Sequence, residues 1–330
     1  MKKRSIIITF IFIGLFLGGS GNTVFAEKIT LLSLNMGAKG RTAALIADMI
    51  DESGADVVFL QEVWVKPPEN AALNRMVGRL GKDWAFVTSS SYALMEMQYK
   101  GEETYKTGGY AQNNAILYNK KKLILTDFAD ALGFTDFNGD YLFDKNNVQV
   151  VAFKLAENQS SSYDLYAINV HLPYNDYQHR MRDLETLEKL YAKYKRSGAL
   201  VIAGDFNLNR SVLTTRNFDF VDGSERWFSD LNYGIATTVS PSNKDYVIFV
   251  NDYDHFIYNR KLKPVEEMHR AFSEERNAGT NASAGTGSFY EARKRNSDLI
   301  RFGKNVYTRG VDYREAVSDH VPIMLTIEVE

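Results

Sequence analysis

Acidic, amide and imidazole side chains stand at the ends of several apolar runs in this 330-residue chain. Seven such residues are Asn35, Glu62, His171, Asp205, Asn207, Asp319 and His320. Taken singly, each has an ordinary structural explanation, such as a turn or a helix cap. In layered α/β folds, however, the ends of neighbouring strands and the loops after them meet in one crevice. Because all seven share this placement, the pattern favours one common site.

The oxygen-bearing residues of this set are suited to a hard divalent cation. Glu62, with Asn35 and Asp319 nearby, offers only oxygen ligands. Mg²⁺ binds through one or two carboxylates, keeps several waters and takes substrate phosphate as a further ligand. Mn²⁺ is an alternative ion, and Ca²⁺ is a candidate for this position or for a second, structural site. The predicted cofactor is therefore Mg²⁺.

The remaining residues of the set can move protons and orient water. His171 and His320 can act as acid, base or phosphate donor near neutral pH. Asp205 and Asn207 are two apart on an extended segment, so their side chains point the same way. Together with a metal ion that neutralises developing charge, these groups are typical of phosphoester hydrolysis.

Other chemistries find little support. The chain has no cysteine, which excludes thiolate zinc sites and cysteine nucleophiles. It has no P-loop, no G-x-S-x-G elbow and no H-E-x-x-H pair. The other three histidines, His179, His255 and His269, lie in helical, strand and linker contexts, and we interpret them as structural or surface residues.

Strand-like and helical segments alternate along the chain, which predicts an α/β layered domain. The strand-like segments are 28–35, 55–62, 163–171, 198–207, 253–259 and 323–327. Apolar residues recur at helical spacing over 42–53 and 176–195. No internal repeat or domain boundary is visible, so residues 27–330 are predicted to form one catalytic domain.

The first 26 residues have the pattern of a secretory signal. Lys2, Lys3 and Arg4 precede an apolar run that is too short to span a membrane, and small residues lead to Ala26. We expect cleavage after Ala26 and a secreted or periplasmic protein; an uncleaved anchor is the alternative. Without those three residues, 36 basic residues stand against 41 acidic ones, a net charge near −5. Binding to nucleic acid through bulk positive charge is therefore excluded.

A small, polar stretch at 277–288 predicts a surface loop, and basic residues follow it over 293–309. These basic residues indicate either a solvated face or a contact with the backbone of a polyanionic substrate.

Six short motifs resemble, in their order, the endonuclease/exonuclease/phosphatase superfamily, the deoxyribonuclease-I-like group. They are "LN.G" at 34–37, "QE" at 61–62, "NVHL" at 169–172, "GDFN" at 204–207, "YDHF" at 253–256 and "SDHVP" at 318–322. The resemblance covers residues 28–330. Together with the signal, it indicates that the chain is similar to a secreted bacterial member of this superfamily. It implies a four-layer α/β sandwich of two packed, mostly antiparallel sheets flanked by helices.

The resemblance also implies roles for the matching residues. Glu62 would be the principal metal ligand and Asn35 a supporting one. His171 would contact the scissile phosphate or act as acid. Asp205 and Asn207 would position the nucleophile and the phosphate.

The last two motifs would supply a base. Asp254 would orient a catalytic histidine. Asp319 and His320 would act together as the general base, with Asp319 also near the metal.

The favoured substrate is DNA, cleaved by a nuclease. "GDFN" followed by "LNR" is more similar to nucleases, and "TYK" at 104–106 resembles a Tyr-Lys segment of the pancreatic-type enzyme. Tyr105 is therefore a candidate substrate contact, and Asn114 is a second one. No protein partner is implied, and a monomer is expected.

A sphingomyelinase-type phospholipase C acting on membrane sphingolipid is the alternative. The segment 108–119 resembles the "GG.A" strand of that group. Those enzymes enter lipid with an exposed aromatic hairpin, whereas the stretch 298–313 here has Phe302, Tyr307 and Tyr313 among basic residues and no Trp. A binding protein with an inactive site is a third alternative, disfavoured because each motif position holds a competent residue.

Overall fold

The computed structural model describes thirteen stretches of the chain. They are residues 27–37, 42–65, 71–88, 111–127, 148–157, 165–174, 176–215, 226–227, 238–239, 251–259, 261–265, 269–274 and 299–329. The predicted signal 1–26, the loop 277–288 and Tyr105 lie outside them. Among the helices of the described part, none has the length and apolar character needed to cross a membrane.

The first sheet is built around the parallel pair β1 and β2. Its strands are β1 (Glu27–Asn35), β2 (Val57–Val65), β3 (Trp84–Thr88), β4 (Ala111–Asn119), β11 (Leu262–Pro264), β12 (His269–Arg270) and β16 (Ile323–Val329). Their order is β11-β16-β1-β2-β4-β3, with β12 also paired to β16. Every pair except β1 with β2 is antiparallel.

The second sheet repeats this plan around the parallel pair β7 and β8. Its strands are β5 (Leu123–Asp127), β6 (Val148–Leu155), β7 (Leu165–His171), β8 (Ala199–Asp205), β9 (Arg226–Trp227) and β10 (Asp254–Tyr258). They lie in the order β5-β6-β7-β8-β10-β9, and the other pairs are antiparallel.

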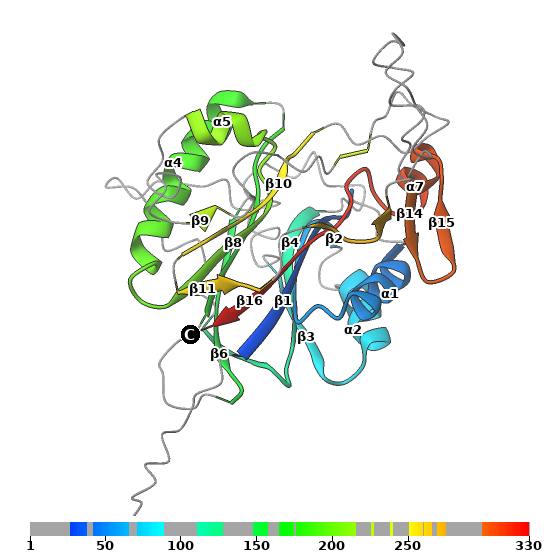
Figure 1. Cartoon of the computed structure of the whole chain (residues 1–330), viewed down its shortest axis with the longest axis horizontal. Coiled ribbons are helices and arrows are strands. Elements are labelled where there is room, and N and C mark those ends of the chain that lie inside the picture. The colour runs from blue at the N-terminus through cyan, green and yellow to red at the C-terminus, as the bar shows by residue number, and fades with distance from the viewer. Residues whose placement is uncertain are drawn as a thin grey trace, which may run out of the picture.

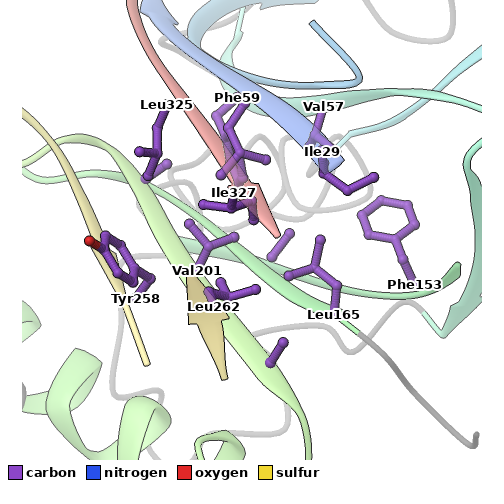
Figure 2. Close-up of a cluster of buried hydrophobic side chains, with 14 of the residues drawn as sticks. Ile29, Val57, Phe59, Phe153, Leu165, Val201, Tyr258, Leu262, Leu325 and Ile327 are labelled. Atoms are coloured by element: carbon purple, nitrogen blue, oxygen red, sulfur yellow. The ribbon is translucent and has the colours of Figure 1, made fainter. Parts of the chain in front are cut away.

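The main core lies between the two sheets, where alternate residues of each strand point inward. Figure 2 shows part of this core, with Ile29, Phe59 and Ile327 from the first sheet and Leu165 and Val201 from the second. Because the strands alternate, the intervening residues of the second sheet face the opposite way and pack under helices.

Helices cover both outer faces. α1 (Ala43–Ser53) and α2 (Ala71–Leu80) pack on the first sheet, while α4 (Tyr177–Tyr194) and α5 (Arg210–Thr215) pack on the second (Figure 1). Asp176 caps α4 by accepting from the backbone N–H of His179 at 2.9 Å. The order helix, sheet, sheet, helix confirms the predicted four-layer α/β sandwich.

A small satellite packs against α1. It consists of β13 (Ser273–Glu274), β14 (Leu299–Phe302) and β15 (Asn305–Tyr307), followed by α7 (Gly310–Ala316). Phe302 and Tyr313 are buried, and Tyr307 lies between them with ring centroids 5.9 and 5.4 Å away. The three aromatic side chains of this segment therefore form its own core.

Candidate active site

The strand ends named by the sequence meet at one edge of the sandwich. Asn35 ends β1, and His171 and Asp205 are register partners at the ends of the parallel strands β7 and β8. The antiparallel strands begin at this edge: Asp254 opens β10 opposite Asp205, and His320 lies just before β16. Carboxyl ends of parallel strands and amino ends of antiparallel ones thus coincide.

Glu62 reaches this edge by a different route. β2 continues to Val65, so Glu62 does not end the strand as predicted. Leu60 pairs with Ala115 but Val63 pairs with Asn113, which leaves one extra residue on β2, a β-bulge. Glu62 has φ 51°, the left-handed region that non-glycine residues rarely adopt. The bulge re-aims its carboxylate out of the strand toward the site.

Asn35 joins the carboxylates of the two sheets. Its Nδ2 donates to Glu62 Oε1 and to Asp205 Oδ2, both at 3.0 Å. Its Oδ1 accepts from the backbone N–H of Gly37 at 2.8 Å. A Cβ on Gly37 would lie 3.2 Å from Asp319 Oδ1, so the turn after β1 passes close to Asp319.

Asp205 is fully buried at the centre of the cluster. Its Oδ1 accepts from the backbone N–H of Asn207 at 2.8 Å, and Asn207 Nδ2 donates to Leu172 O at 2.7 Å. Asn207 also has a positive φ of 49°, which marks a second strained position at the site. Burial raises the pKa of Asp205, His320 opposes the rise, and Asp254 adds to it. Asp205 is thus held as an unusually basic carboxylate.

His320 is paired with Asp254 and not with its sequence neighbour. Its Nδ1 lies 2.8 Å from Asp254 Oδ2, and its Nε2 lies 3.6 Å from Asp205 Oδ2. Burial alone would lower the pKa of His320, but the charges of Asp254 and Asp205 outweigh it and raise the pKa to about 10. A raised pKa favours the imidazolium form of His320 at neutral pH.

Asp319 points away from this pair. Its side chain is 47% exposed and lies 3.7 Å from Arg314 Nη2. The predicted pairing of Asp319 with His320 as a general base is thus replaced by a pairing of Asp254 with His320. Adjacent residues on an extended segment face opposite sides, so Asp319 and His320 do not meet. Its predicted role near a metal stays a prediction.

His171 completes the cluster from β7. Its Nε2 lies 3.5 Å from Glu62 Oε1 and 3.9 Å from Asp205 Oδ2, and the side chain is 20% exposed. It is therefore positioned at the mouth of the site, where a bound phosphate could reach it.

Some site residues were not singled out from the sequence. Ser318 Oγ donates to Asn35 O at 2.6 Å and accepts from His320 N–H at 3.1 Å, which links the two ends of the chain. Its signal was its place in "SDHVP".

Asn114, predicted to contact substrate, is buried, and its Nδ2 donates to Asn169 O at 3.3 Å. The structure places it beneath the site, because it lies opposite the bulge in β2.

The carboxylates of this cluster suit a hard divalent cation that keeps several of its waters, such as Mg²⁺. Glu62, Asp205 and Asp254 carry three formal negative charges against one imidazolium at His320, so the cluster has an excess of negative charge. In the described stretches, no three His, Cys, Asp or Glu side chains converge to form a complete metal cage. One or two carboxylates with water and substrate suffice for Mg²⁺. Glu62, with its side chain 23% exposed, is the carboxylate best placed to hold it.

The other histidines lie elsewhere. His255 is buried on β10, with Nε2 3.0 Å from Leu208 O. His179 lies on α4, 3.5 Å from Asp183, and His269 lies in β12.

Comparisons with known proteins agree with this geometry. Residues 32–320 match the model of the Endonuclease/Exonuclease/phosphatase family. A protein of that family from Bacteroides thetaiotaomicron superposes with TM-score 0.57 at 14% identity, over 92% of this chain and 99% of that one. A humanized D. rerio TDP2 gives TM-score 0.56 at 15% identity, over 92% and 99% of the two chains.

A third similar structure is a mannosyl-6-phosphatase of B. thetaiotaomicron, with TM-score 0.55 at 14% identity, over 91% of this chain and 99% of that one. At these identities the likeness shows the fold alone. No curated protein matches the chain by sequence.

Proposed function

We propose, from the premise that this chain belongs to the endonuclease/exonuclease/phosphatase family, that it is a divalent-metal-dependent phosphodiesterase that cleaves DNA. Members of this family are metal-dependent hydrolases of phosphoester bonds. The observation that carries the proposal is the convergence of Glu62, His171, Asp205 and the His320–Asp254 pair at one edge of the sandwich. One cluster thus provides a carboxylate for a metal ion, groups for acid–base catalysis and donors to a phosphate.

A divalent cation held by Glu62 would neutralise charge that develops on the phosphoryl oxygens. The chain's own residues divide the proton work. Asp205, with its raised pKa, accepts the proton of the attacking water as the water oxygen bonds to phosphorus. The bond from phosphorus to the leaving oxygen breaks, and that oxygen takes a proton from His171.

In this proposal His320 donates a hydrogen bond to the phosphate in place of acting as the predicted base. Because its pKa is about 10, the imidazolium holds its proton at neutral pH and suits donation to a phosphoryl oxygen. Asp254 keeps the ring oriented and charged through its bond to Nδ1, 2.8 Å long. Asn35 and Asn207 fix Asp205 by hydrogen bonds to its two oxygens.

The aromatic side chains favour DNA over a lipid substrate. Phe302 and Tyr313 are buried in the satellite, so they cannot enter a bilayer. Tyr174 lies three residues after His171, and its side chain is 66% exposed. Tyr174 and Asp205 are both near Tyr253, because burial and the electrostatic effects of these two residues raise the pKa of Tyr253. An exposed ring beside the site provides a stacking surface for a base, which is a common mode of binding single strands.

The basic residues of the satellite support the same substrate. Arg301 and Lys304 are exposed on the β14–β15 hairpin. They can contact a phosphate backbone despite the acidic net charge. The preceding basic residues, 293–295, lie outside the described residues.

The test is to give residues 27–330 plasmid DNA and sphingomyelin vesicles in parallel, each with Mg²⁺. We expect DNA cleavage that stops with EDTA and in Glu62→Gln. Sphingomyelin hydrolysis without DNA cleavage would establish the alternative substrate. DNA binding without turnover in both wild type and Glu62→Gln would establish a binding protein.

Secretion is proposed from the sequence alone, with the signal cut after Ala26. Mass spectrometry of protein recovered outside the cytoplasm should find Glu27 at the N-terminus. Recovery of the whole chain from the membrane fraction would instead indicate an uncleaved anchor.

A further inference from the structure

Three buried amide side chains surround the bulge that carries Glu62. Gln61 and Asn169 are 0% exposed, and Asn114 is 1% exposed. Gln61 and Glu62 stand opposite the single residue Asn114 in the β2–β4 ladder. Burying an amide is costly unless its polar atoms find partners. The amide nitrogens of all three residues donate hydrogen bonds, whereas Gln61 Oε1 has no partner among the described residues.

Asn169 forms the centre of the network and comes from the other sheet. Its Nδ2 donates to Leu60 O at 3.0 Å and to Ala115 O at 2.9 Å, one carbonyl from each strand beside the bulge. Its Oδ1 accepts from Gln61 Nε2 at 2.8 Å. One side chain of β7 thus bonds to the backbone of both strands beside the bulge in the first sheet.

Asn169 lies on the same face of β7 as His171. Leu165 and Ala167 of β7 face the core between the sheets, and Asn169 and His171 follow at the same alternation. Asn169 therefore lies directly below His171, whose Nε2 is 3.5 Å from Glu62 Oε1. The network connects the strand that carries Glu62 with the strand that carries His171.

We infer that Asn169 is a positioning residue, which holds Glu62 in its left-handed bulge and so sets the separation of the metal-binding carboxylate from His171. Glu62 would otherwise relax, because its φ of 51° is unfavourable for a residue with a side chain. The inference rests on the proposed function only in taking Glu62 as the metal ligand. Groups that orient a ligand from behind typically change metal affinity by about 10- to 100-fold when removed.

The chain contains a matched control. Asn259 is also buried, at 2% exposure. Its Nδ2 donates to Lys195 O at 3.2 Å and to Gly198 O at 2.9 Å, and its Oδ1 accepts from Leu200 N–H at 3.1 Å. It has the same residue type and bonding pattern as Asn169, but it follows β10 at the edge of the second sheet away from the site.

The test compares Asn169→Asp with Asn259→Asp in residues 27–330. Both changes set an oxygen against two backbone carbonyls, so both should lower the thermal midpoint. Mn²⁺ binding is then measured by calorimetry without substrate, at a temperature where each protein is folded. We expect about 10- to 100-fold weaker Mn²⁺ binding in Asn169→Asp, and wild-type binding in Asn259→Asp.

A second variant covers the case in which Asn169→Asp does not fold. Gln61→Met removes the donor to Asn169 Oδ1 but leaves both carbonyl bonds in place, and it should also weaken Mn²⁺ binding. Wild-type affinity in the folded variants, or equal losses in Asn169→Asp and Asn259→Asp, would overturn the inference.

The inference and the proposed function fail separately. A wild-type protein that binds Mn²⁺ in the Asn169-dependent manner but cleaves no DNA would refute the substrate and leave the positioning role standing. DNA cleavage with unchanged Mn²⁺ affinity in Asn169→Asp would do the reverse. A wild-type protein that binds no Mn²⁺ would overturn the role given to Asn169.

Discussion

Replacing Gly204 with alanine should damage both stability and catalysis, since this glycine stands where β7 and β8 touch. A Cβ at this position would lie 2.0 Å from Val170 O, whereas ordinary contact begins at 3.4 Å. The two strands must therefore separate by about 1.4 Å, the difference between those distances. Its φ of +141° is also a conformation that side-chain-bearing residues rarely adopt.

The expected cost combines two effects. A sparsely populated backbone conformation costs about 1–3 kcal/mol, and overpacking costs about 1–3 kcal/mol more. The sum, about 2–6 kcal/mol, is a large part of the 5–15 kcal/mol that typically holds a domain folded. The next pair in the register is His171 with Asp205, so their separation must change too. A misplacement of about 1 Å at such groups lowers kcat on the order of 100-fold.

Urea unfolding and the rate of DNA cleavage measure the two effects. Gly78→Ala is the control, since Gly78 lies in α2, and a Cβ there meets nothing within 4 Å. That change should stabilise the protein by about 0.5–1 kcal/mol. A Gly204→Ala protein within about 1 kcal/mol of wild type, with unchanged kcat, would refute the steric reasoning.

Four further predictions concern the rest of the site. In EDTA, the stability that His320 contributes relative to His320→Gln should be fully present below pH 6.5 and lost as pH rises toward about 10, because its pKa is raised on folding. Urea unfolding at several pH values measures this, and a contribution that grows with pH would contradict it. Asp254→Asn should bring the pKa of His320 down, as followed by NMR titration, and His320→Ala should lower kcat by about 10²–10⁴. Tyr174→Ala should raise KM for DNA by about 5- to 150-fold, from a stacking energy of about 1–3 kcal/mol, while hydrolysis of a small chromogenic diester stays the same; a KM change shared by both substrates would argue against stacking.

Much of the scaffold could be predicted because it depends on local pattern. The predicted strands 163–171 and 198–207 correspond to β7 and β8, and the predicted helix 176–195 corresponds to α4. Alternating and helical apolar spacings report directly which face of an element is buried. The four-layer sandwich followed from the resemblance carried by the motifs, and the two sheets with helices on both outer faces confirm it.

The prediction of Glu62 shows where local pattern stops. Its residue type and position were singled out correctly as part of the cluster, but the end of its strand was not. β2 continues to Val65 because a bulge lets Glu62 leave the ladder without ending it. A bulge depends on the pairing with β4 and on the amide of Asn169, and neither is visible in the sequence around Glu62.

The sequence by itself determined which residue types are available for chemistry, and it placed most of them at strand ends. It excluded cysteine chemistry and indicated oxygen ligands for a divalent cation. Only the tertiary structure decided which groups act together. His320 is adjacent to Asp319 in the chain but bonds to Asp254, 66 residues away. Asn169 holds Leu60 O, 109 residues away, because the two sheets, built from different stretches of the chain, meet face to face. Partnership across a core is a property of distance in space, which spacing along the chain does not encode.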